Sequence, residues 1–158
     1  ILNIGFASRW HSQKNFPFFF ESLSKLKNDY KLGKFKVYMA GNNINRENNN
    51  LVDLINKHKL SNDIVLLNEI KDMPKFYNSI DVNVLTSSFG EAFPNVLAEA
   101  MSCETPCLST DIGDSKRIIS DTGWIINQDD KNIIALLSTI LTVETELSTG
   151  VDNKPVPM

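Results

Sequence analysis

The chain has 158 residues with 16 basic and 19 acidic side chains, a net charge of -3. Its 42% hydrophobic and 22% charged residues are typical of one globular domain and exclude disordered and collagen-like classes. The slight acidic excess argues against non-specific binding to nucleic acid, so we expect no nucleic-acid partner. No apolar run approaches the roughly 18 residues that a membrane-spanning helix needs.

Short apolar runs alternate with longer amphipathic stretches, which predicts a parallel sheet with crossover helices. In chain order we expect a strand at residues 1–7, a polar loop at 8–15, a helix from Pro17 to Gly33, a strand at 36–40 and an Asn-rich loop at 42–50. There follow a helix at 51–59, strands at 64–67 and 82–85 around a short helix at 74–79, and a helix that starts at Pro94 and Asn95. A strand at 106–109, a helical turn at 115–119, a strand at 124–126 and a helix at 132–141 complete the series.

This series predicts an α/β fold with a doubly wound parallel sheet over residues 1–144, followed by a polar tail at 145–158 that frays. In such sheets ligands bind where strands end and loops lead into helices. The rule nominates five loops, at residues 8–15, 41–43, 68–71, 87–95 and 110–114.

Two of these loops carry charges that suit a sugar nucleotide. Arg9 and Lys14 follow the first strand, near Gly5, and Glu91 lies directly before a helix N-terminus. Because a helix start presents unpaired N–H groups and a positive dipole end, it would bind a diphosphate together with the two cations. The carboxylate of Glu99, inside that helix, suits a vicinal diol such as a ribose.

No metal is expected. Cys103 and Cys107 have no nearby histidine, which makes them a poor zinc signature. The chain also has no Asp-x-Asp pair.

The segment from Gly90 to Met101, GEAFPNVLAEAM, resembles the E-x7-E motif of retaining glycosyltransferases with the GT-B fold, family GT4 (glycosyltransferase group 1). Arg9 with Lys14 resembles that family's Arg and Lys pair after the first strand of the donor-binding domain. Residues 40–42 stand where that family usually has a Gly-Asp/Glu-Gly turn, and residues 107–113 and 121–123 match its later strand–loop pair. The resemblance therefore covers about residues 4 to 141, in the correct order. It implies a Rossmann-like domain that forms the C-terminal half of a GT-B fold.

The resemblance also implies roles for single residues. Arg9 and Lys14 would bind the donor's phosphates and stabilise the leaving nucleoside diphosphate, and Glu91 would contact the transferred sugar. These three are the expected catalytic residues. The expected donor-binding residues are Gly5, Ile70 for the nucleobase, Phe93, Pro94, Asn95 and Val96 for the sugar and diphosphate, and Glu99 for the ribose.

The implied reaction moves a sugar from a nucleotide-diphosphate sugar to an acceptor hydroxyl with retention, in polysaccharide or glycolipid synthesis and without a cofactor. The implied partners are the nucleotide sugar, a sugar or lipid-linked acceptor and an N-terminal acceptor domain that this sequence lacks. Without that domain we expect little or no turnover. The expected location is cytoplasmic, at the inner face of the membrane if the missing part reaches it. The alternative function is a non-catalytic module that binds a nucleotide or a sugar phosphate.

Two positions depart from the family's pattern. Asn15 replaces the glycine that commonly follows the lysine, although Asn tolerates a positive φ. Asn42 and Asn43 stand where an acidic residue is usual.

Overall fold

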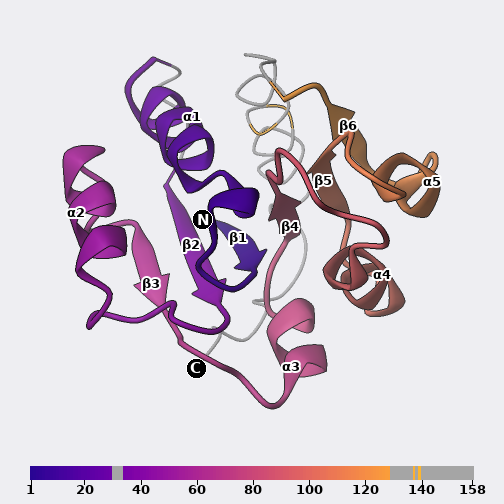
Figure 1. The fold of residues 1–158 in the computed structure, drawn as a ribbon, viewed down its shortest axis with the longest axis horizontal. Coiled ribbons are helices and arrows are strands. Elements are labelled where there is room, and N and C mark those ends of the chain that lie inside the picture. Colours follow the sequence, from indigo (N-terminus) through magenta and orange to yellow (C-terminus); the bar gives the residue numbers. More distant parts are fainter. Residues whose placement is uncertain (30–33, 129–136, 138, 140–158) are drawn as a thin grey trace.

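Figure 1 shows the computed structural model of the chain, which describes residues 1–29, 34–128, 137 and 139. Within these residues the sheet has six parallel strands in the order β3-β2-β1-β4-β5-β6. The strands are β1 (Leu2–Ala7), β2 (Phe35–Ala40), β3 (Ile64–Leu66), β4 (Val82–Leu85), β5 (Cys107–Thr110) and β6 (Trp124–Ile126). The helices are α1 (Phe16–Asp29), α2 (Asn49–Lys57), α3 (Met73–Asn78), α4 (Asn95–Ser102) and α5 (Ser115–Ile119), with a 3-10 turn at Ser12–Lys14. The predicted doubly wound α/β fold is confirmed.

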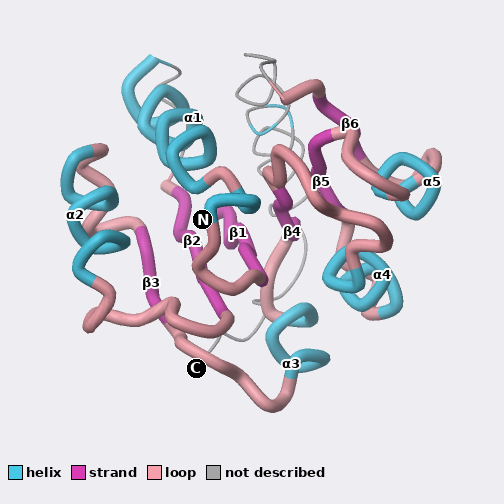
Figure 2. The backbone as a smooth tube through the Cα atoms, in the orientation of Figure 1, coloured by secondary structure: helices cyan, strands magenta, loops and turns pink. Residues whose placement is uncertain are grey.

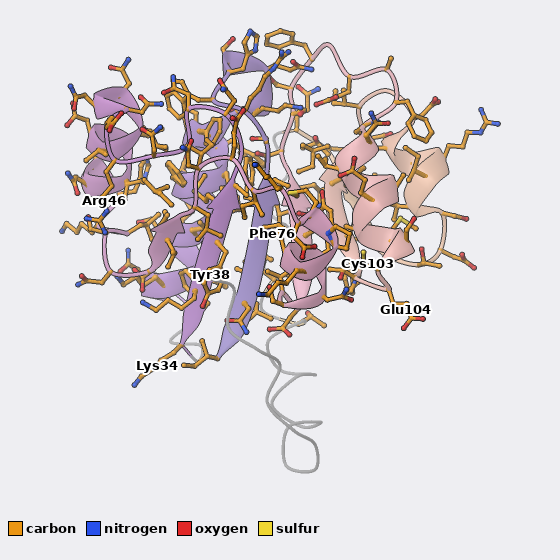
Figure 3. All side chains as sticks on the ribbon, turned by 90° about the horizontal axis from the view of Figure 1, so that it is seen from below. Lys34, Tyr38, Arg46, Phe76, Cys103 and Glu104 are labelled. Carbon is orange, nitrogen blue, oxygen red and sulfur yellow. The ribbon has the colours of Figure 1, made fainter. Side chains whose placement is uncertain are left out.

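The helices form a layer on each face of the sheet, α1 and α2 on one and α3, α4 and α5 on the other (Figure 2). The first core cluster joins α1 and α2 to the sheet and is rich in phenylalanine. The second joins α3, α4 and α5 to the opposite face. In Figure 3, Tyr38, Phe76 and Cys103 follow one another across this second face.

The sequence of β1 is apolar almost throughout because helices cover both faces of this strand. Leu2, Ile4 and Phe6 belong to the first cluster, and Ala7 belongs to the second. Successive side chains of a strand point to opposite faces, so an almost continuous apolar run is what a strand between two helical layers requires.

The expected elements agree with the structure within two residues, except where the structure does not describe them. The helix that we expected from residue 51 begins at Asn49, because the side chain of Asn48 accepts a hydrogen bond from the backbone N–H of Leu51 at 3.2 Å. The loop predicted for residues 42–50 was therefore wrong at its last two positions. Gly33, most of the helix at 132–141 and the tail at 145–158 lie outside the described residues, although Leu137 and Thr139 are helical.

The strand order determines where a ligand can bind. β1 and β4 are neighbours, yet the chain leaves β1 towards β2 on one side and leaves β4 towards β5 on the other. A crevice forms at the carboxyl ends of strands where the winding reverses in this way. The loops that begin at Ser8 and Thr86 therefore flank the expected binding position. In the part of the chain that the structure describes, no helix is both long and apolar enough to cross a membrane.

Candidate functional site

An ion pair joins the two loops at the reversal of the winding. Lys14, the last residue of the 3-10 turn after β1, contacts Oε1 of Glu91 with its ammonium group, across 77 positions of sequence. The hydroxyl of Ser87 donates to the same carboxylate oxygen at 2.7 Å. The Lys14 and Glu91 side chains are only 12% and 10% exposed. Two residues that the sequence analysis proposed for phosphate and sugar are thus in direct contact.

Backbone contacts fix this arrangement. The Thr86 hydroxyl donates to the carbonyl of Lys14 at 2.8 Å, and the Ser88 N–H donates to the carbonyl of Gln13 at 2.9 Å. Asn15 has a φ of 52°, the left-handed conformation that we expected Asn to tolerate in place of glycine. The β1 and β4 loops therefore pack as one unit.

The β5–α5 loop supports the same unit from the other side. Gly113 has a φ of 55°, and a β-carbon added there would overlap the carbonyl oxygen of Glu91 and lie 2.6 Å from that of Ala92. The Asp114 N–H donates to the Ala92 carbonyl at 2.9 Å, and the Thr110 hydroxyl donates to the carbonyl of Ser87 at 2.6 Å. Glu91 is consequently held between two neighbouring loops.

α4 points its N-terminus at this unit. Pro94 is the N-cap residue of the helix, and within the described residues no side chain forms a capping hydrogen bond with its first turn. The backbone N–H groups at the helix start, at Asn95 and Val96, thus remain available to an anion. Leu97 and Ala100 are buried in the second core cluster, which holds the helix against the sheet.

Glu99 lies one turn further along α4 and is exposed. Its Oε2 accepts a hydrogen bond from the hydroxyl of Tyr77 in α3 at 3.0 Å. Burial raises the pKa of Tyr77 above its ordinary value, and the negative charge of Glu99 raises it further. Tyr77 therefore stays protonated and remains a hydrogen-bond donor.

Comparison with known families adds to this geometry. The family described as "Glycosyl transferases group 1" matches residues 2–143. The chain belongs to the glycosyl transferases group 1 family. A search of curated protein sequences finds no match.

Solved structures of glycosyltransferases have a domain with the same fold as this chain. Anabaena Alr3699/HepE in complex with UDP-glucose is 19% identical with a TM-score of 0.76, over 92% of this chain and 40% of that one. The lipopolysaccharide outer core galactosyltransferase WaaB in its apo form is 18% identical with a TM-score of 0.75, over 90% of this chain and 41% of that one. A glycosyltransferase from Rickettsia africae ESF-5 is 24% identical with a TM-score of 0.74, over 94% of this chain and 38% of that one. The likeness shows the Rossmann-like fold of a GT-B glycosyltransferase domain, and the chain spans about two fifths of these proteins.

Three other predicted site residues, Gly5, Arg9 and Ile70, make no hydrogen bond or ion pair with Lys14 or Glu91 within the described residues. Gly5 lies inside β1, where an added β-carbon would overlap Ile80 and lie 3.3 Å from Cζ of Phe76, so close packing explains this glycine. Arg9 follows β1 and is exposed, and its side chain makes no ion pair within the described residues. Ile70 is half-buried in the loop after β3 and packs against the second core cluster. Any contact of these three residues with a donor stays a prediction.

The exposed Phe93 precedes the helix start in the same loop as Glu91. Near the turn after β2, the side-chain amide of Asn42 donates a hydrogen bond to Glu69 at 3.0 Å. The loop after β3 therefore supplies a carboxylate beside a turn that has none of its own.

Within the described residues, no three His, Cys, Asp or Glu side chains are grouped as a metal site would require.

Three residues that contribute to the site were not predicted from the sequence. Ser87 follows β4 at the end of the strand where ligands bind, so the rule that selected Glu91 could have selected it as well. Gly113 carried a weaker signal, because a glycine in a nominated loop often marks a close approach of two backbones. Tyr77 had no signal, since it lies in a short helix whose contact with α4 depends on the tertiary fold.

Proposed function

We propose that the chain is the donor-binding domain of a retaining glycosyltransferase of family GT4. The enzyme would move a sugar from a nucleotide-diphosphate sugar to an acceptor hydroxyl in polysaccharide or glycolipid synthesis. The contact of Lys14 with Glu91 at the reversal of the winding carries this proposal. It brings together a cation suited to phosphate and a carboxylate suited to sugar hydroxyls, beside the start of α4.

The phosphate end of the donor would lie against Lys14 and the first N–H groups of α4, with Arg9 reaching it from the loop after β1. Negative charge builds up on the diphosphate as the glycosidic bond breaks. Fixed positive groups in a poorly hydrated site stabilise that charge more in the transition state than in the ground state. In this proposal the chain neutralises the diphosphate with its own side chains and needs no metal.

The sugar would lie at Glu91. Lys14 and Ser87 both use Oε1 of this carboxylate, and within the described residues no hydrogen bond reaches Oε2. Oε2 can therefore accept from a sugar hydroxyl while the carboxylate stays in place. The two contacts on Oε1 orient Glu91 before the donor arrives, which lowers the entropy lost on binding.

A donor-binding role also fits what is known of the structural relatives. Anabaena Alr3699/HepE has been solved with UDP and glucose and with UDP-glucose, and a mutant of S. aureus TarM with fondaparinux, alpha-GlcNAc-glycerol and UDP. This chain spans about two fifths of the first of these proteins and less of the second. We propose that the acceptor is bound by a separate N-terminal domain, so the present chain binds the donor and turns it over poorly.

Calorimetric titration of the chain with UDP, GDP and ADP tests the proposal. At least one diphosphate should bind, and Arg9→Ala should weaken its binding by about 10-fold, the effect of losing one charge-assisted hydrogen bond. Arg117→Ala is the matched control, because Arg117 is an exposed arginine on α5. The proposal fails if none of the three diphosphates binds, or if Arg9→Ala and Arg117→Ala both bind as the unmodified chain does.

A further inference from the structure

Tyr77 stands out as a buried polar group beside a predicted ligand contact. Its side chain is 1% exposed in the second core cluster, while its hydroxyl reaches Glu99 on the neighbouring helix. Glu99 itself is exposed. The hydrogen bond therefore connects the interior of the domain to a carboxylate at its surface.

The backbone of Tyr77 is fixed as well as its ring. The buried hydroxyl of Thr105 donates to the Tyr77 carbonyl at 2.7 Å, which ties the end of α3 to the loop between α4 and β5. The Phe76 ring packs against the Tyr77 ring edge to face, with centroids 5.4 Å apart. The hydroxyl is thus a donor in a set position, and Glu99 adapts to it.

An exposed glutamate normally samples several rotamers, and ordering its side chain costs conformational entropy. A fixed donor on Oε2 restricts those rotamers before any ligand arrives, and among the residues that the structure describes none donates to Oε1. A vicinal diol needs a carboxylate oxygen in a defined place to accept its hydroxyl protons. Restricting Glu99 in advance would therefore favour a ligand with a diol over one without.

We propose that Tyr77 is a positioning residue that holds the Glu99 carboxylate in the orientation needed to bind the ribose diol of the nucleotide. This inference rests on the proposed donor site and deepens it. Tyr77 acts through Glu99 and does not touch the nucleotide. Its raised pKa keeps the hydroxyl a donor, so the selectivity it provides should not change with pH through ionisation of this residue.

The test measures the preference of the chain for a diol. Calorimetry gives the affinity for the nucleoside diphosphate that binds best among UDP, GDP and ADP, and for its 2′,3′-dideoxy analogue. Tyr77→Phe removes only the hydroxyl and should reduce the preference for the ribonucleotide by about 5-fold, with the dideoxy affinity unchanged. Tyr38→Phe makes the same chemical change in the same core cluster away from Glu99 and should leave the preference as it is.

Glu99→Gln separates this inference from the proposed function. It should lower the preference at least as much as Tyr77→Phe, and the double variant should show no further loss, because the two residues act through one contact. If Glu99→Gln lowers the preference and Tyr77→Phe does not, the positioning role is wrong while the donor site stands.

Three other results would overturn the positioning role of Tyr77, and the last of them would also overturn the proposed function. An equal loss of affinity for both nucleotides in Tyr77→Phe, together with a lower thermal midpoint, would make Tyr77 a structural residue only. No preference for the diol in the unmodified chain would remove the ribose role of Glu99, and with it that of Tyr77. Failure of all three diphosphates to bind would overturn the proposed function and this inference together.

Discussion

The ion pairs at the two ends of the sheet differ in how far their side chains are exposed to solvent. At the amino end, Lys27 pairs with Asp63 at 2.7 Å, with side chains 40% and 20% exposed. At the carboxyl end, the paired side chains of Lys14 and Glu91 are 12% and 10% exposed. Both pairs join distant parts of the sequence, but only the second is largely removed from water.

The difference in exposure bears on whether each ion pair contributes to stability or to another role. An exposed pair costs little to desolvate and contributes about 0–1 kcal/mol. A largely buried pair loses much of the hydration of both ions and is often no more stabilising than two apolar residues would be. The chain keeps such a pair where the winding of the sheet reverses, which is consistent with our proposal that the pair serves ligand binding more than stability.

Replacing the lysine at each end should show the contrast most strongly. Lys14→Ala removes the proposed phosphate contact and leaves Glu91 buried without its cation, so diphosphate affinity should fall about 100-fold, with about 1–2 kcal/mol of stability lost. Lys27→Ala should change stability by no more than about 0.5 kcal/mol and affinity not at all. Calorimetry and denaturant unfolding measure both. Equal changes of diphosphate affinity and of stability in the two variants would show that the two ion pairs do not differ in role.

The packing of the carboxyl-end loops can be tested separately from their charge. Gly113→Ala places a methyl group against the Glu91 and Ala92 carbonyls at a positive φ, and should cost about 2–3 kcal/mol of stability. Gly90→Ala is the matched variant. Gly90 also has a positive φ, of 72°, but a β-carbon added there would come no closer than 3.3 Å to a side-chain atom of Gln13, so we expect a loss of about 1 kcal/mol. Thermal unfolding of the two variants would contradict this account if Gly90→Ala were the less stable.

The same loops show what could be predicted from sequence. Strand order was not predicted, yet the rule that ligands bind at carboxyl ends placed Lys14 and Glu91 at one edge, where the structure has them in contact. The direct pairing of the two could not be foreseen, because the expectation assigned each to a different part of a ligand. The contact of Tyr77 with Glu99 depends on how α3 packs on α4, and no spacing along the chain reports that.

Glu91→Gln tests whether the buried pair of Lys14 and Glu91 affects diphosphate binding. The substitution keeps the shape of the side chain and removes its charge, so Lys14 no longer divides its attraction between Glu91 and a phosphate. Affinity for the free diphosphate should then rise about 3-fold, in contrast to the loss in Lys14→Ala. Asp63→Asn at the amino end should leave the affinity unchanged, and calorimetry compares the two. A lower diphosphate affinity in Glu91→Gln would mean that the carboxylate orients the lysine for phosphate rather than competing for it.

The smallest effect is expected at the amino end, where His58 follows α2 and its ring centroid lies 6.4 Å from that of Phe20. Burial lowers the pKa of His58 from its ordinary value of 6.5, and the charge of Lys57 lowers it further. Because the folded state then binds this proton less readily than the unfolded state does, His58 disfavours folding as the pH falls below about 6.5. His58→Gln should therefore lose slightly less stability between pH 7 and pH 5 than the unmodified chain. Parallel curves of unfolding free energy against pH would show that the pKa of His58 is the same in the folded and unfolded chains, which would contradict the lowering by burial and by Lys57.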